Sequence, residues 1–204
     1  MNKTLKKEEV KNLISETLSL IHLYKKNGLT IPFALKGNIG EFIVYNTLLT
    51  KFPHSKIEFS GGAMPGYDIQ LDNLKIQVKT KIVEEEKYAL VEGCPTIKKK
   101  IIDEKKCDFI ILLAIRMLED FSNIKEINTY IFSQDDFKYF STTRCWSGRS
   151  KGDYTICNVI WVKENAPKGY MQGINYYNNN EYHGLFNSSK NNWEKIKEKI
   201  DLKN

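Results

Sequence analysis

The stretch that decides the fold is residues 67–79, which read Tyr67-Asp68-Ile69-Gln70-Leu71-Asp72-Asn73-Leu74-Lys75-Ile76-Gln77-Val78-Lys79. Apolar and polar residues alternate on both sides of Asp72-Asn73, and this period of two is typical of strands. Asp and Asn tolerate a positive φ, so the pair between the two runs predicts a two-residue turn. The stretch therefore predicts an antiparallel hairpin.

The hairpin is expected to bring three polar side chains together. Gln77 and Lys79 are two residues apart and share one face of a strand, whereas Val78 points the opposite way, into the core. Asp68 begins the first strand, and the tight turn returns the second strand beside it, so Asp68 converges with Gln77. A carboxylate, an amide oxygen, a backbone carbonyl and waters form a hard oxygen site suited to Mg²⁺. An ammonium such as Lys79 beside that site depresses the pKa of an attacking water and offsets charge on a pentacovalent phosphorus.

Two helices are predicted before the hairpin. Apolar residues recur at helical spacing over residues 6–26 and 33–51. A short strand at residues 56–59 and a Gly-rich loop at 60–66 then lead to Asp68. Glu41 lies among apolar residues in the middle of the second helix, and it is the candidate for a further ligand because Gln77 brings one negative charge fewer than Glu. A solvated helix Glu is the alternative for Glu41.

The elements expected after the hairpin complete an α/β order. Residues 108–116 form a continuous apolar run, as in a strand that is covered on both faces. The other predicted elements are a helix at 95–106 with Ile97, Ile101 and Ile102 inward, strands at 127–132 and 154–162, a short helix opened by residues 133–136, and a last helix capped by Asn187-Ser188-Ser189 that ends near Leu202. This order predicts an α/β fold with a central mixed sheet flanked by helices on both faces, in one domain over residues 1–204.

Composition limits the class of protein. The chain has 204 residues, 41% hydrophobic and 27% charged, as in a soluble globular protein, and its longest apolar run, 109–115, is too short for a membrane span. The polar first residues predict no signal peptide, and four Cys without metal-type spacing are expected to be reduced thiols, so a cytoplasmic protein is predicted. No Walker loop is present, which excludes ATP-driven translocation, and three isolated His argue against a His-metal nuclease.

The positive charge predicts a nucleic-acid partner. Lys+Arg total 31 against 25 Asp+Glu, a net charge of +6, and residues 138–168 contribute six cations against two acids. Two of the three Arg lie in the Gly- and Ser-containing stretch 144–152, where Arg suits base edges and Lys suits phosphates. The alternative is a solvated loop between strands, with the neighbouring aromatic residues in the core. The candidate DNA-binding residues are Lys81, Arg144, Trp146, Arg149 and Lys151.

The order of these motifs resembles a known family. Asp68 followed by Gln77-Val78-Lys79, and preceded by Lys36-Gly37-Asn38-Ile39-Gly40-Glu41, looks like the PD-(D/E)XK nuclease superfamily, which has a restriction-endonuclease-like core. The variants with Gln in the third acidic position, such as Mrr-type restriction nucleases, are the most similar, and the helix motif also resembles that of archaeal Holliday junction resolvases. The resemblance covers residues 36–116. It departs from the family where Tyr67 replaces Pro and where Gln77 replaces an acid.

The resemblance implies an enzyme and assigns roles to its residues. Asp68 and Gln77 would ligate Mg²⁺, for which Mn²⁺ can substitute, Lys79 would assist the nucleophilic water, and Glu41 would join the site. The expected activity is that of a type II restriction endonuclease that cuts double-stranded DNA and leaves 5′-phosphates. We expect a homodimer formed through residues 1–30, a catalytic core at 36–116 and an extension at 127–204 with a DNA-binding loop. A methyltransferase acting on the same DNA site, without being bound, would be its partner.

Three alternatives remain at this stage. A junction-resolving or repair nuclease would read DNA shape, and a catalytically inert module of the same fold would bind DNA without cutting it. A small-molecule α/β enzyme has no motif to support it. Apart from these functions, Asp68 could be an ordinary loop residue, with Gln77 and Lys79 on the solvent face of an amphipathic strand.

Overall fold

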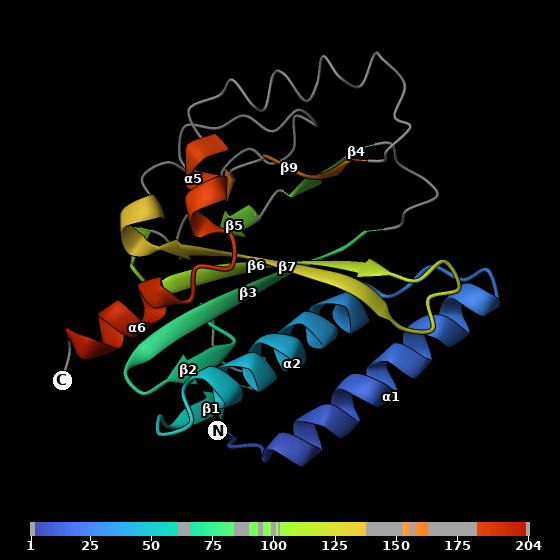
Figure 1. The fold of residues 1–204 in the computed structure, drawn as a ribbon, viewed down its shortest axis with the longest axis horizontal. Coiled ribbons are helices and arrows are strands. Elements are labelled where there is room, and N and C mark those ends of the chain that lie inside the picture. The colour runs from blue at the N-terminus through green and yellow to red at the C-terminus, as the bar shows by residue number, and fades with distance from the viewer. Residues whose placement is uncertain are drawn as a thin grey trace.

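A mixed five-stranded sheet forms the centre of the molecule. The computed structural model describes residues 3–60, 66–83, 90–93, 96–98, 101, 103–137, 153–155, 158–162 and 183–202. The sheet has the order β1-β2-β3-β6-β7 (Figure 1), with β1 at Ile57–Phe59, β2 at Ile69–Leu71, β3 at Leu74–Val83, β6 at Phe109–Met117 and β7 at Ile124–Ser133. β3 and β6 are parallel and the other neighbours are antiparallel, so the predicted mixed sheet is confirmed.

Helices cover both faces of this sheet, as the sequence predicts. α2 (Phe33–Lys51) packs on one face of β3 and β6, and α1 (Lys7–Lys26) packs on α2 (Figure 1). α6 (Glu194–Asp201) shares that core through Ile196, whereas α5 (His183–Ser189) covers the opposite face through Phe186. The apolar run of β6 serves both cores, because its side chains alternate between the two faces. Within the described residues, no helix is long and apolar enough to span a membrane.

The predicted hairpin is present between β2 and β3. Ile69 pairs with Ile76 and Leu71 with Leu74, so Asp72 and Asn73 form the turn. Asp72 has a φ of 51°, the left-handed conformation that the turn requires. Its carboxylate also accepts a hydrogen bond of 2.8 Å from the Lys56 backbone N–H, which ties the turn to the segment before β1.

The predicted helix at 95–106 is wrong over its first part. Residues 96–98 form strand β5 (Thr96–Lys98), which pairs antiparallel with β8 (Asp153–Thr155). Ile101 and Asp103 are helical, and Ile101 packs against the core on the face of the sheet that α5 covers. The spacing of the isoleucines suits a helix locally, but the backbone groups of residues 96–98 are satisfied by a strand more than fifty positions away in the sequence. A pairing of that range overrides local propensity. Ile102, and the side chain of Ile97, lie outside the described residues.

The single strand predicted at 154–162 is also wrong. The chain forms two strands there, β8 and β9 (Asn158–Val162), and each belongs to its own two-stranded sheet. β9 pairs antiparallel with β4 (Leu90–Gly93), with a register shift between Val91 and Glu92. The alternating sequence satisfies either arrangement, since the alternation does not encode which partner each part pairs with.

The predicted last helix is present as α6, which ends at the predicted place, with Leu202 as its C-cap, but starts later than predicted. Asn187, Ser188 and Ser189 do not cap a helix but close α5, while Trp193 stands at the N-cap of α6. The Ser188 hydroxyl donates back to the Leu185 carbonyl at 3.1 Å, so it serves the preceding turn. The short helix predicted after Ser133 is present as a 3₁₀ turn at residues 134–137, and its Asp136 carboxylate accepts from the Ser133 N–H at 2.7 Å.

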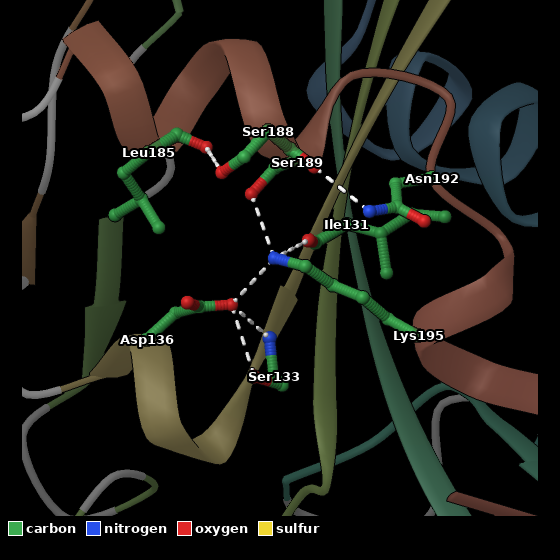
Figure 2. A network of polar contacts seen from close by, with 8 residues as sticks. All are labelled: Ile131, Ser133, Asp136, Leu185, Ser188, Ser189, Asn192 and Lys195. Atoms are coloured by element: carbon green, nitrogen blue, oxygen red, sulfur yellow. Dashed lines mark hydrogen bonds and ion pairs between the residues drawn. The ribbon is translucent and has the colours of Figure 1, made fainter. Parts of the chain in front are cut away.

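A partly buried cluster around Lys195 joins these C-terminal elements to the sheet (Figure 2). The Lys195 ammonium donates to Asp136 Oδ2 at 3.0 Å, to Ser189 Oγ at 3.1 Å and to the Ile131 carbonyl at 3.3 Å. The two charged side chains are only 20% and 15% exposed. We call Lys195, Asp136, Ser133, Ser189 and Ile131 the Lys195 clamp, because it connects α6, α5, β7 and the 3₁₀ turn.

Candidate active site

One pocket brings the predicted catalytic residues together. It has a volume of about 570 Å³ and lies between the N-terminal half of α2 and the exposed edge of β3. Glu41, Asp68, Gln77 and Lys79 all line it, and so does Lys81. Its remaining lining residues are Phe33, Lys36, Gly37, Val78, Thr80 and Ile82.

The pocket exists because β2 is shorter than β3. β2 begins at Ile69, opposite Ile76, while β3 continues to Val83 with β6 along its other side. Gly66 has a φ of 118°, a conformation that glycine adopts readily, and the described chain enters the sheet only after it. β3 therefore has no strand neighbour on that side beyond Gln77 within the described residues, and side chains from both faces of the sheet reach this edge.

Asp68 and Gln77 meet at the start of this edge. The Asp68 backbone N–H donates to the Ile76 carbonyl at 2.9 Å, so the contact between the two hairpin segments extends to the residue before β2. Gln77 Nε2 donates to Asp68 Oδ2, and the Val78 backbone N–H donates to the same oxygen at 2.7 Å. The carboxylate thus satisfies the first N–H of β3 that lacks a strand partner. The convergence expected from the hairpin is present in the structure.

Val78 and its neighbours follow the predicted pleat. Val78 is 5% exposed and belongs to the core beneath α2. Gln77 is also buried, whereas Lys79 is partly exposed. Within the part of the chain that the structure describes, Lys79 forms no ion pair, so its ammonium remains available to a bound group.

Glu41 reaches the pocket because α2 approaches β3 very closely. A Cβ atom at Gly40 would lie 1.9 Å from Thr80 Oγ1, which is much closer than two non-bonded atoms can come. Gly40 therefore lets the helix backbone lie against the strand, and Glu41, the next residue, is carried to the same edge. Glu41 and Asp68 interact electrostatically across the pocket, and Lys79 acts on both.

Burial and like charge disfavour the ionised carboxylates here. The pKa of Glu41 is raised to about 7, mainly by burial and also by the negative charge of Asp68, while the positive charge of Lys79 opposes both effects. Burial also raises the pKa of Asp68, against the Val78 N–H, Lys79 and Gln77, which favour its ionised form. In this pocket, therefore, the two acids are harder to ionise than free carboxylic acids.

The donor atoms fit a hard divalent cation. Asp68 and Glu41 offer carboxylate oxygens, and Gln77 offers an amide oxygen, since its Nε2 is engaged by Asp68. A cation between them would favour the ionised carboxylates that burial disfavours. No group of three or more His, Cys, Asp or Glu positioned for a metal occurs among the described residues, so the site has two acids and one amide.

Some predicted residues cannot be placed, and two residues of the pocket were not predicted to act there. Arg144, Trp146, Arg149 and Lys151 lie outside the described residues. Lys36 was part of the helix motif but had no assigned role. The sequence assigns Phe33 only to the start of the predicted helix, whereas the structure leaves it 91% exposed at the pocket. No pattern in the sequence separates an exposed apolar residue at a helix start from a buried one.

Comparison with known proteins leaves the family open. No family model matches the chain, and no curated protein matches it. Among solved structures it is similar to a bacterial homing endonuclease, I-Ssp6803I, with a TM-score of 0.37 and 18% sequence identity over 72% of this chain and 95% of that chain. At this level of similarity the chemistry has to be inferred from the pocket itself, and membership of the PD-(D/E)XK superfamily stays a prediction.

Proposed function

We propose that this protein is a Mg²⁺-dependent endonuclease that hydrolyses phosphodiester bonds in double-stranded DNA, in the manner of a type II restriction enzyme. The observation that carries the proposal is the shared pocket of Asp68, Gln77, Lys79 and Glu41 beside β3. It unites two acids, an amide and an ammonium that come from α2, β3 and the residue before β2, and groups of these kinds support phosphodiester hydrolysis.

Each residue has a role that follows from its surroundings. Asp68, held by the Val78 N–H and the Gln77 amide, would bind the cation with Gln77, and Glu41 would bind it directly or through water. The cation, when bound, supplies positive charge where negative charge develops on the phosphate. Lys79 would orient and polarise the attacking water, which displaces the 3′ oxygen in line and leaves a 5′-phosphate. Mn²⁺ offers similar oxygen affinity and is expected to substitute.

The surroundings of the pocket support an anionic polymer as the substrate. Lys36 and Lys81 line the pocket beside the proposed catalytic residues, and the whole chain carries a net charge of +6. Lysines hold phosphates as point charges without reading sequence, so sequence readout would fall to other parts of the chain. The restriction type, the homodimer and the partner methyltransferase are expectations of the sequence that we retain within this proposal.

Plasmid cleavage in the presence of Mg²⁺ tests the proposal. Wild-type protein should convert supercoiled plasmid to nicked and linear forms, with Asp68→Ala and Lys79→Ala strongly impaired. Lys11→Ala is the matched control, because Lys11 is a half-exposed lysine on α1, whose charge is paired only with a neighbouring Glu8. Equal lack of cleavage by wild type and variants, with DNA binding intact, would identify an inert DNA-binding module. A preference for four-way junctions over every linear duplex would exclude the restriction type.

A further inference from the structure

The mouth of the pocket carries an aromatic ring that packs against almost nothing. Phe33, the first residue of α2, is 91% exposed, the most exposed large hydrophobic side chain among the described residues. Burying a Phe side chain stabilises a fold, so leaving the ring in water forgoes this stabilisation. Its one recorded ring contact is with Lys36, whose ammonium lies 5.9 Å from the ring centroid. The ring therefore does little for folding.

Phe33 and Glu41 line the same pocket from one helix. Phe33 and Glu41 are eight positions apart on α2, so their Cα atoms are about 12 Å apart at 1.5 Å per residue. Along one DNA strand the rise is about 3.4 Å per nucleotide. With one phosphate bound at the carboxylates, the base that reaches Phe33 would therefore be roughly three or four nucleotides along the strand. Lys36 lies between Phe33 and Glu41 on the helix, and the exposed Lys81 continues the strand face of Lys79.

We infer that Phe33 is a stacking platform for an unstacked base of the DNA strand that is cut. Lys36 and Lys81 would contact the phosphates next to that base. Every base has a π-face that stacks on an aromatic side chain, and such stacking is worth about 1–3 kcal/mol per base. Inside a duplex both faces of each base are covered by the neighbouring pairs. The ring can therefore stack only on a base that is flipped out, bulged, single-stranded or at a strand end.

This inference rests on the proposed nuclease function and specifies its substrate. The enzyme would act on DNA in which one nucleotide near the cut is already out of the base stack, as in distorted, bulged or single-stranded DNA. A fully stacked duplex would lose the Phe33 contact and retain only the contacts of the lysines to phosphates.

Binding in EDTA tests the inference without cleavage. We would measure the anisotropy of a labelled single-stranded oligonucleotide and of a hairpin-closed duplex of the same sequence. Phe33→Ala should weaken single-strand binding by roughly 5- to 150-fold and leave the closed duplex within about twofold. Phe33→Trp should bind like wild type, and Phe33→Leu, which keeps the apolar character but not the π-face, should bind like Phe33→Ala. Leu202→Ala is the control, because Leu202 is 80% exposed and does not line the pocket.

A second readout reports stacking directly. Oligonucleotides with 2-aminopurine at successive positions lose fluorescence when the modified base stacks on an aromatic ring. One position should be quenched by wild type and by Phe33→Trp, but not by Phe33→Leu.

Several outcomes would overturn the inference. These are unchanged single-strand binding in Phe33→Ala, full single-strand binding in Phe33→Leu, and a loss on the closed duplex equal to that on the single strand. A dimer seen by sedimentation in wild type and lost in Phe33→Ala would assign the ring to a protein interface instead. Failure of the nuclease proposal looks different: wild type would not cleave DNA with Mg²⁺, while Phe33-dependent binding in EDTA could remain.

Discussion

Two clusters of charged side chains lie partly buried in this protein, and they are built in opposite ways. In the Lys195 clamp, the single ammonium meets three acceptors, and Asp136 Oδ2 accepts from Lys195 and twice from Ser133 (Figure 2). In the pocket, two acids face one another with raised pKa values, and Lys79 has no ion-pair partner among the described residues. Buried polar groups that are fully satisfied stabilise a fold, whereas unsatisfied groups mark a place where something binds.

The sharpest test of this contrast is to remove the lysine from each cluster. Lys79→Ala should lower plasmid cleavage by about 10²- to 10⁴-fold, because the water loses the group that orients and polarises it. Its thermal midpoint should stay close to that of wild type, since the Lys79 side chain forms no ion pair or hydrogen bond among the described residues. Cleavage rates and thermal denaturation would be measured on the same preparation. A large loss of stability in Lys79→Ala would mean that the pocket is structural.

The opposite pattern is expected at the clamp. Lys195→Met keeps the length of the side chain but leaves Asp136, which is 15% exposed, without its cation. Breaking a fully buried pair costs about 3–5 kcal/mol, and partial exposure should reduce this to about 2 kcal/mol of unfolding free energy. Chemical denaturation would measure it, with unchanged cleavage per folded molecule. Lys197→Ala is the control: Lys197 is 60% exposed, and its ion pair with Glu194 should contribute less than about 1 kcal/mol. Similar losses in both variants would remove the distinction between a clamp and a surface pair.

The pH dependence of the unfolding free energy should reveal the raised pKa of Glu41 in the pocket. The pKa of Glu41 is raised from 4.5 to about 7 in the folded protein, so ionisation of Glu41 opposes folding. Protonated Glu41 therefore contributes to the unfolding free energy. This contribution is complete below pH 4.5 and is lost as the pH rises through 7. Without metal, Glu41→Gln should therefore be more stable than wild type by about 2 kcal/mol at pH 8, with no such gain at pH 4.

Urea denaturation at both pH values would measure this difference. The exposed Glu119→Gln serves as the control and should show no pH-dependent gain. Mg²⁺ should reverse the order at pH 8, because a cation stabilises the ionised Glu41 and cannot do so in Glu41→Gln. A Glu41→Gln variant that is less stable than wild type at pH 8 without metal would contradict the raised pKa.

The sequence predicts those parts of this pocket that depend on local pattern. Asp72-Asn73 sets a two-residue turn, the turn sets the register of the hairpin, and the register places Asp68 opposite Gln77. α2 has the bounds that its apolar spacing predicts. By contrast, Thr96–Lys98 pairs with a distant segment, and no local pattern reports that pairing. The exposure of Phe33 and the pKa of Glu41 depend on how closely α2 lies on β3, which is a property of packing rather than of spacing.

That close approach leads to the smallest of the predicted effects, at two glycines on one helix. Gly40→Ala would place a Cβ atom 1.9 Å from Thr80 Oγ1, so α2 must shift away from β3. We expect a loss of about 1–2 kcal/mol in unfolding free energy, together with lower cleavage, because Glu41 moves with the helix. Combining Gly40→Ala with Thr80→Ala should restore part of the unfolding free energy and part of the cleavage activity, since Thr80→Ala removes two of the three clashing atoms, Oγ1 and Cγ2.

Gly37→Ala is the matched control for Gly40→Ala. A Cβ atom there would meet only Glu41 Oε1, at 3.9 Å, and replacing a glycine inside a helix by Ala stabilises it by about 0.5–1 kcal/mol. Chemical denaturation should therefore give effects of opposite sign at two positions that are three residues apart. If both substitutions stabilised the protein and left cleavage unchanged, the close approach of α2 would not be what crowds the acids. The contrast between pocket and clamp would then need another cause.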